Sequence, residues 1–168
     1  PAMTGPELAL FKAFLRPAAG YLEFGTGGST VLAARLVGRG VISVDSSVEW
    51  LGKVQAACEA SRSRLTPMLV PVDIGPVGDW GFPADEATRD RWPHYHEGVW
   101  SVPGSTESSL FMVDGRFRVA CFMQVLLRCR PGAIVLIHDF ADRPYYQVVR
   151  EVAREVACVE RLSAFIAE

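Results

Sequence analysis

The chain has 168 residues, of which 49% are hydrophobic and 21% are charged, and its formal net charge is −2. A chain of this length can bury one substantial core, so we predict a single domain over residues 1–168. The weak negative charge gives no general attraction to phosphate polymers, so nucleic acid is not expected as a partner. No apolar run is long enough to span a bilayer and no signal-peptide pattern opens the chain, so we expect a cytoplasmic protein with no membrane partner.

The four cysteines stand far apart in the sequence, without any Cys-x-x-Cys spacing. Cys58, Cys121 and Cys129 fall in segments with helical periodicity, and Cys158 lies near the end of the chain. We expect all four to be reduced and to act as small buried hydrophobic side chains.

Helical and strand-like patterns alternate along the chain. Helices are predicted over residues 6–15, 30–37, 117–129 and 145–156, and a further helix starts at Ser46, where Glu49 completes a capping box. Its apolar face consists of Trp50, Leu51, Val54 and Cys58. Strands are predicted over residues 21–24, 41–44, 68–72, 110–113, 133–137 and 159–166. Such alternation predicts an α/β fold of three layers, with helices on both faces of a mostly parallel sheet.

Residues 75–106 break this periodicity and form a long irregular insertion with prolines, glycines and aromatic residues. Loops of this length in compact domains are usually functional or disordered, and the aromatic content favours an ordered, functional loop. Trp92, Tyr95 and Trp100 form either a wall for a substrate or a cluster folded onto the domain surface.

Acidic residues stand at or just after the end of five predicted strands. They are Glu23, Asp45, Asp73, Asp114 and Asp139. Acids in such loops can simply cap the following helices. Because ligands of open α/β sheets bind at the carboxyl ends of the strands, five acids in this position favour a binding site there.

The stretch from residue 21 to residue 30 has the pattern of a cofactor loop. A short apolar strand carries Glu23, and Gly25, Gly27 and Gly28 lead into an apolar helix. Glycines let the backbone approach a ligand closely, and the first turn of a helix offers unpaired N–H groups.

Two classes of cofactor use such a loop. Gly25, Gly27 and Asp45 match a dinucleotide fingerprint, but Thr30 stands where its third glycine belongs. The carboxylate of Glu23 would repel a pyrophosphate, whereas it would attract a cationic ligand. The residues therefore favour S-adenosylmethionine, which carries a sulfonium and an ammonium group and no phosphate.

Residues 23–29 resemble the first motif of the class I S-adenosylmethionine-dependent methyltransferases, an acid-x-Gly-x-Gly pattern. The resemblance covers essentially the whole chain and implies a Rossmann-like sheet with an antiparallel C-terminal strand. It also implies S-adenosylmethionine as the cofactor, with its methionine part beside the glycine turn. The residues implied to bind it there are Glu23, Phe24, Gly25, Thr26, Gly27, Gly28 and Ser29.

The same resemblance assigns residues at the ends of the other strands. Asp45, with Ser46 beside it, matches the acid that binds the ribose hydroxyls. Asp73 and Ile74 match the position that borders the adenine, and Asp114 falls next to the donor methyl group.

Methyl transfer requires an aligned acceptor and often a base that removes its proton. The candidate catalytic residues are Asp114, His138 and Asp139, and the long loop contributes His94 and His96. The alternative for His138 is a structural histidine that is hydrogen-bonded to the backbone at a strand end.

Asp114 and Asp139 also resemble the two metal-binding acids of the cation-dependent catechol-type O-methyltransferases. That family has an asparagine after the second acid, where this chain has Phe140, so we do not favour a divalent cation. His94 and His96 have no evident third ligand, which disfavours a zinc site.

Arg116 and Arg118 follow Asp114, and they either anchor an anionic acceptor or lie solvated at the start of a helix. The solvated position is the one we predict. The family typically ends in an antiparallel strand pair, and this sequence shows one terminal strand, so we expect a truncated sheet edge or one completed by a partner. The sequence does not decide whether the protein forms a homo-oligomer.

We predict methyl transfer from S-adenosylmethionine to a small-molecule acceptor, with a weak preference for oxygen. One alternative is a methyltransferase-like binding or regulatory domain without turnover. The other is an NAD-dependent oxidoreductase, which the charge of Glu23 disfavours.

Overall fold

The structure is a computed structural model that describes residues 1–168. A sheet runs through its centre, with strands β1 (Gly20–Phe24), β2 (Gly40–Asp45), β3 (Met68–Pro71), β4 (Leu110–Val113), β5 (Ile134–Ile137), β6 (Arg154–Val159) and β7 (Leu162–Ile166). The α-helices are α1 (Gly5–Leu15), α2 (Gly28–Leu36), α3 (Val48–Ala60), α4 (His94–Glu97) and α5 (Arg118–Leu126). None of the helices combines the length and the apolar character needed to cross a membrane.

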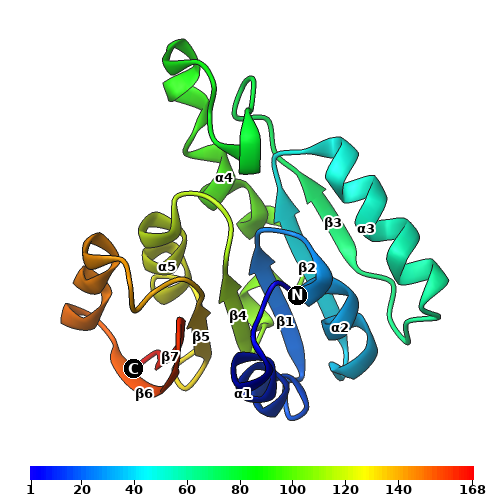
Figure 1. Cartoon of the computed structure of the whole chain (residues 1–168), viewed down its shortest axis with the longest axis vertical. Helices are drawn as coiled ribbons and strands as arrows, with labels where there is room; N and C mark the ends of the chain where they lie inside the picture. The colour runs from blue at the N-terminus through cyan, green and yellow to red at the C-terminus, as the bar shows by residue number, and fades with distance from the viewer.

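The order of the strands creates one place where a ligand can enter the sheet edge. The order is β3-β2-β1-β4-β5-β7-β6, with β1 to β5 parallel and β7 antiparallel to both of its neighbours. The connections run to one side from β1 and to the other side from β4, so the carboxyl ends of these two strands form a topological switch point. The arrowheads of β1 and β3 mark this edge in Figure 1.

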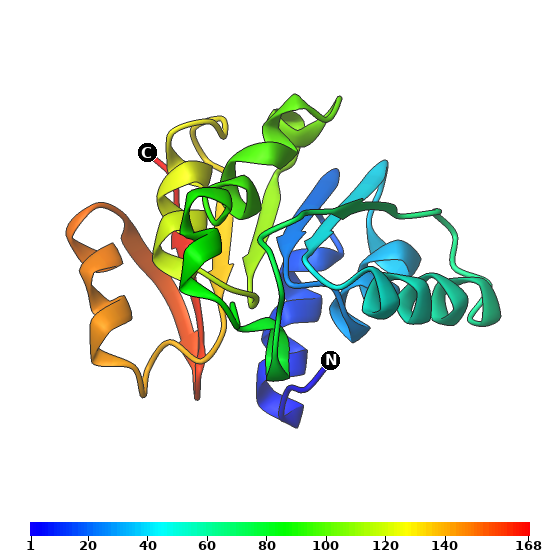
Figure 2. The same cartoon turned by 90° about the horizontal axis from the view of Figure 1, so that it is seen from above.

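Helices cover both faces of the sheet, which confirms the predicted three-layer α/β/α architecture (Figure 2). Apolar residues of α1, α2 and α3 pack on one face, around Phe11, Ala33 and Val54. The other face packs against α4, α5 and the 3₁₀ helix η5 (Pro144–Glu151), around Phe122 and Val149. The central strands are buried on both faces, so they read as continuous apolar runs.

Two helix starts show how local sequence fixes the elements. Thr4 and Glu7 form a reciprocal capping box at α1, which begins one residue before the predicted start. The predicted cap of α3 was wrong by one residue, because Ser47 and not Ser46 accepts the amide of Trp50, at 3.2 Å.

Two side-chain predictions for the helices were also wrong. Trp50 is 45% exposed, although we expected it on the apolar face of α3. Cys58 and Cys121 are buried as expected, whereas Cys129 is half-buried and Cys158 is exposed.

The insertion between β3 and β4 is ordered. It contains α4 and the 3₁₀ helices η1 (Asp79–Gly81), η2 (Glu86–Arg91), η3 (Gly98–Ser101) and η4 (Ser105–Glu107). Tyr95 is buried, and its ring and that of Trp100 pack on Phe24 at centroid distances of 6.4 and 6.2 Å. Most of the aromatic residues therefore anchor the loop to the core, and only Trp80 and Phe82 are largely exposed.

The C-terminal segment differs from the sequence prediction. Residues 145–156 do not form one helix, because η5 ends at Glu151 and β6 begins at Arg154. Strands β6 and β7 form an antiparallel hairpin whose inner strand β7 pairs with β5. The expected truncation of the sheet edge was therefore wrong. The valines at positions 148, 149, 152 and 156 fall at helical spacing, which explains the error, although they belong to η5, the following turn and β6.

Gly25 has a backbone that only glycine adopts easily. Its φ is +102°, and a Cβ atom there would lie 2.5 Å from the amide nitrogen of Gly115. We predict that Gly25→Ala lowers the free energy of unfolding by at least about 2 kcal/mol, since it adds both backbone strain and a clash with backbone. Urea denaturation measures this change.

Gly27→Ala is the matched control in the same loop. Gly27 has an extended φ of 179° and open space around its Cα, so its substitution should change stability by less than about 0.5 kcal/mol. Equal effects of the two substitutions would contradict the close packing of Gly25 on Gly115.

Candidate functional site

The five acids at the strand ends have different environments. Glu23 is fully buried, Asp45, Asp114 and Asp139 are half-buried, and Asp73 is exposed. Only some of them can therefore contact a ligand at the open edge of the sheet.

Glu23 points into the protein interior, where its hydrogen bonds hold the glycine loop in place. Its carboxylate accepts hydrogen bonds from the hydroxyls of Tyr21 at 2.7 Å, of Ser43 at 2.8 Å and of Thr30. Thr30 in turn accepts the amide of Gly27 at 2.9 Å, so the loop is tied to the buried carboxylate through one hydroxyl. The direct role toward a ligand charge that we expected for Glu23 does not match this enclosed position.

Burial raises the pKa of Glu23 to about 6, although the surrounding hydroxyls oppose this shift. Burial also raises the pKa of Tyr21 well above its ordinary value, and the neighbouring Glu23 charge adds to this. Tyr21 is therefore a hydrogen-bond donor to the carboxylate at all physiological pH values.

Asp45 holds the other side of the glycine loop. Its carboxylate accepts the amide of Thr26 at 3.1 Å and the amide of Ser47 at 3.0 Å. The indole nitrogen of Trp50 donates to the carbonyl oxygen of Thr26 at 2.6 Å. Because Gly28 lies at the start of α2, its amide and the next ones point out of the helix end without intrahelical partners. The loop thus presents free N–H groups beside a half-buried carboxylate.

The residues after β3 follow a strand that β2 separates from β1. Asp73 forms an ion pair with Arg91 at 3.1 Å and accepts the amide of Gly75 at 2.8 Å, while Ile74 is fully buried. Ser46 lies under the tip of η1, where a Cβ atom on Gly81 would be 3.5 Å from its hydroxyl oxygen.

Asp114, His138 and Asp139 come together at the ends of β4 and β5, as the sequence predicted. The Nδ1 atom of His138 lies 3.2 Å from Asp114 and 3.7 Å from Asp139. Asp139 has a left-handed backbone with φ 51°, which occurs at functional sites more often than elsewhere.

Two further residues, which the sequence did not indicate, join this group together with Arg118. Glu7 of α1 lies 3.3 Å from Nε2 of His138 and accepts the amide of Arg161 at 3.0 Å. Arg161 also pairs with Asp139 at 2.8 Å. We call these residues the charge cluster; its members are Glu7, Asp114, Arg118, His138, Asp139 and Arg161.

Arg118 lies at the centre of the charge cluster and is only 7% exposed, so the prediction of a solvated arginine was wrong. Its guanidinium pairs with Asp114 at 3.1 Å and with Asp139 at 3.2 Å. It also donates to the carbonyl oxygens of Asp114 and Gly115, at 3.0 and 3.1 Å, and to that of His138.

The charge cluster is electrically neutral when His138 is protonated. Burial opposes protonation, but hydrogen bonds and charges of Asp114, Glu7 and Asp139 raise the pKa of His138 above its ordinary value. Burial also acts to raise the pKa of Glu7, yet bonds from Thr4, Arg161 and His138 lower it on balance. Three carboxylates then face two guanidinium groups and one imidazolium.

Ligand atoms of Asp114, His138 and Asp139 lie within 4.8 Å of one another, which is close enough for a metal site. However, a guanidinium already pairs with each of the two aspartates. A divalent ion would meet two fixed positive charges, so this donor set does not fit one.

His94 and His96 are not part of this site. His94 is exposed, and the charged residues near His96 are Glu97 and Arg128, which follows the C-terminal end of α5. Burial lowers the pKa of His96, so its ring is neutral.

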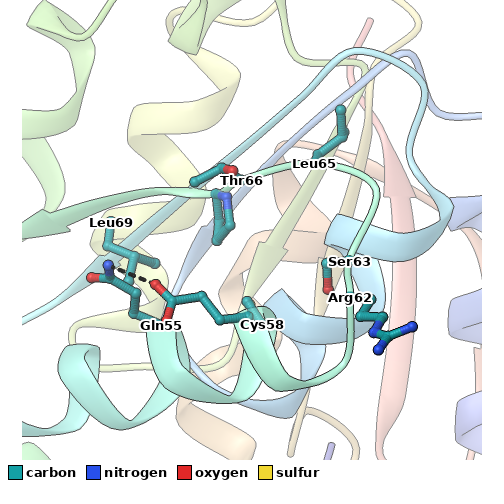
Figure 3. Close-up of a pocket in the computed structure, with 9 residues that line it drawn as sticks. Gln55, Cys58, Arg62, Ser63, Leu65, Thr66 and Leu69 are labelled. Carbon is teal, nitrogen blue, oxygen red and sulfur yellow. Dashed lines mark hydrogen bonds between the residues drawn. The ribbon is translucent and has the colours of Figure 1, made fainter.

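Two surface cavities lie away from the carboxyl edge. One, of about 260 Å³, lies between α3 and β3 and is lined by Gln55, Cys58 and Leu69, among others (Figure 3). The other, of about 310 Å³, lies at the amino ends of β1 and β2, beside Gly20 and Gly40. Neither contains the glycine loop or a member of the charge cluster.

The raised pKa of His138 predicts a pH-dependent stability. The charged ring contributes stability that is complete below the ordinary pKa of about 6.5 and is lost as the pH rises through the higher folded value. The ionised carboxylate of Glu7, whose pKa is lowered, contributes stability at pH values above its ordinary pKa, and this contribution is lost on acidification. We predict that an NMR titration of His138 gives a pKa above 6.5 and that Glu7→Gln lowers it.

His94→Gln serves as the control, because this exposed histidine makes no ion pair. It should leave the pH dependence of urea unfolding unchanged, whereas His138→Gln should remove the loss of stability above neutral pH. A folded pKa of His138 at or below its ordinary value would contradict the neutral charge cluster.

No family model matches the chain, and no curated protein matches its sequence. Among solved structures, a methyltransferase-like protein from Silicibacter pomeroyi is 33% identical, with a TM-score of 0.92 over 100% of this chain and 88% of that one. An O-methyltransferase from Bacillus cereus in complex with SAH is 14% identical, with a TM-score of 0.63 over 100% and 84%. An RNA methyltransferase from Salinibacter ruber in complex with S-adenosyl-L-homocysteine is 11% identical, with a TM-score of 0.59 over 99% and 94%. The last two share the fold alone, while the similarity to the first shows that the chain belongs to the class I S-adenosylmethionine-dependent methyltransferase family.

Proposed function

We propose that the protein binds S-adenosylmethionine at the switch point between β1 and β4 and transfers its methyl group to a small-molecule acceptor. The observation that carries this proposal is the glycine loop, which offers free N–H groups beside the half-buried carboxylate of Asp45. When bound, the cofactor supplies an electrophilic methyl group on a sulfonium.

Each part of the site has a role in this proposal. Residues 24–29 contact the methionine part of the cofactor, and the amides at the start of α2 receive its carboxylate. Asp45 and Ser46 bind the ribose hydroxyls, and Asp73 with Ile74 borders the adenine. Glu23 acts indirectly, because it holds the loop through Thr30.

Asp114 is the acid that meets the acceptor. Its side chain is 30% exposed, compared with 18% for Asp139 and none for Glu7. One carboxylate oxygen, Oδ1, is paired with His138 and Arg118, whereas Oδ2 makes no hydrogen bond or ion pair. We assign Oδ2 as the atom that accepts a proton from the acceptor, with His138 and Arg118 holding the carboxylate in place and Asp139 holding Arg118.

One observation favours a binding or regulatory domain as the second candidate. The carboxylate of Asp114 is already paired with Arg118 and His138, as expected for an acid with a purely structural role. Transfer of methyl groups to a panel of oxygen and nitrogen acceptors separates the two candidates, since a binding domain would bind the cofactor and release no methylated product. The cytoplasmic location and the lack of a nucleic-acid partner stay predictions from the composition.

The role of Asp45 predicts the behaviour of the Asp45→Asn variant. The wild-type protein should bind S-adenosylhomocysteine in calorimetry, and Asp45→Asn should weaken binding roughly tenfold or more, because two charge-assisted hydrogen bonds to the ribose are lost.

Glu49→Gln provides the control, because it also removes one acidic charge near the start of α3 and Glu49 pairs only with Lys53, at 2.7 Å. Its affinity should equal that of the wild type. No detectable binding by the wild-type protein at millimolar ligand would overturn the proposal.

A further inference from the structure

Arg116 is a half-buried arginine at the carboxyl edge of the sheet that has no acidic partner. It takes part in none of the ion pairs, and its Nε atom is buried without any hydrogen-bond partner. Its guanidinium stacks on the ring of Phe82, 4.1 Å from the centroid. An unpaired buried donor on a charged group is costly, so such groups are rare unless a ligand completes them.

The neighbouring arginines cannot share a ligand with Arg116, because their partners are already in place. Arg118 is saturated by Asp114, Asp139 and carbonyl oxygens, and Arg161 pairs with Asp139 and Glu7. Arg116 is therefore the arginine of this edge whose guanidinium forms no ion pair.

Arg116 lies where the two halves of the proposed site meet. The preceding residue, Gly115, packs directly on Gly25 of the glycine loop, and Asp114, two residues before Arg116, belongs to the charge cluster. The charge of Arg116 acts on both sides. Burial is the main cause of the raised pKa of Asp45, and Arg116 counteracts it. Burial likewise lowers the pKa of Arg116, and the charge of Asp114 counteracts that shift. A group bound to Arg116 would thus lie near both Asp45 beside the cofactor loop and Asp114.

We propose that Arg116 binds a carboxylate of the methyl acceptor, which makes the acceptor a small anion. This inference rests on the proposed function. A guanidinium offers two parallel N–H groups that match a carboxylate, and the ring of Phe82 holds it in a fixed plane. The carboxylate of the cofactor has other donors, since the amides at the start of α2 are free.

The direct test measures whether the protein distinguishes carboxylates from neutral molecules of the same shape. The protein, saturated with S-adenosylhomocysteine, is titrated with benzoate and benzamide and with phenylacetate and phenylacetamide, using ligand-detected NMR. The carboxylates should bind roughly 10- to 100-fold more tightly than the amides. Arg116→Met should abolish this preference and Arg116→Lys should keep part of it, because lysine retains the charge without the planar fork.

Arg89→Met is the matched control, because Arg89 is an exposed arginine in the insertion between β3 and β4 and also lies over an aromatic ring, that of Trp92. It should leave the preference intact. Equal binding of carboxylates and amides to the wild type would overturn the inference, as would a preference that survives in Arg116→Met. Both Arg116 variants should fold, since no ion pair is broken, and circular dichroism checks this.

A second measurement separates the acceptor from the cofactor as the source of the carboxylate. Arg116→Met should bind S-adenosylhomocysteine within about threefold of the wild type in calorimetry. A larger loss that is absent for 5′-methylthioadenosine, which lacks the carboxylate, would assign Arg116 to the cofactor and overturn the inference. If the wild type fails to bind S-adenosylhomocysteine, the proposed function fails, and the carboxylate titration of the free protein still decides the role of Arg116.

Discussion

The glycine loop depends on one buried carboxylate. Glu23 lies beneath the loop with no exposure to solvent, and hydroxyls from β1, β2 and α2 surround it. A buried ionised acid is tolerable only with several donors, so Tyr21, Ser43 and Thr30 must keep their positions. Because the hydroxyl of Thr30 also accepts the amide of Gly27, the position of Gly27 is fixed as well. The shape of the cofactor loop is thus fixed from inside the protein, before any ligand binds.

A second set of charges assembles the acceptor side from segments that are distant in the sequence. His138 links Glu7 of α1 to Asp114 after β4, and Arg118 links the ends of β4 and β5. Arg161, in the turn between β6 and β7, brings the C-terminal hairpin to the same place. Removing one member would leave an uncompensated buried charge, which is why we expect the cluster to be sensitive to pH as a unit.

Local sequence patterns predicted most of the architecture. The apolar runs of the parallel strands and the glycine turn before α2 are patterns of only a few residues, so the sequence predicted these elements and the edge at which Asp114, His138 and Asp139 meet. Glu7 could not be identified in this way, because its contact with His138 joins residues 131 positions apart. An acid at this position is also expected simply as part of the capping box of α1.

Other errors had the same cause. Strand alternation does not reveal whether a polar side chain near the end of a doubly covered strand is buried. The sequence therefore predicted a direct contact of Glu23 with the ligand, although its side chain is enclosed. The burial of Arg118 was not predicted, because its partners follow two different strands, β4 and β5, and a local sequence pattern does not show that they meet. Residues 145–156 were read as a helix because the pairing of β6 with β7 is decided by tertiary contacts and not by periodicity.

The most direct test of this account compares Thr30→Val with Thr30→Ser in calorimetric binding of S-adenosylhomocysteine. Valine has the shape of threonine but breaks the link between Glu23 and Gly27, whereas serine retains the hydroxyl. The account predicts that Thr30→Val weakens binding roughly tenfold while Thr30→Ser binds like the wild type. Equal affinity of Thr30→Val and the wild type would show that the loop binds its cofactor without the buried carboxylate, and would contradict the account.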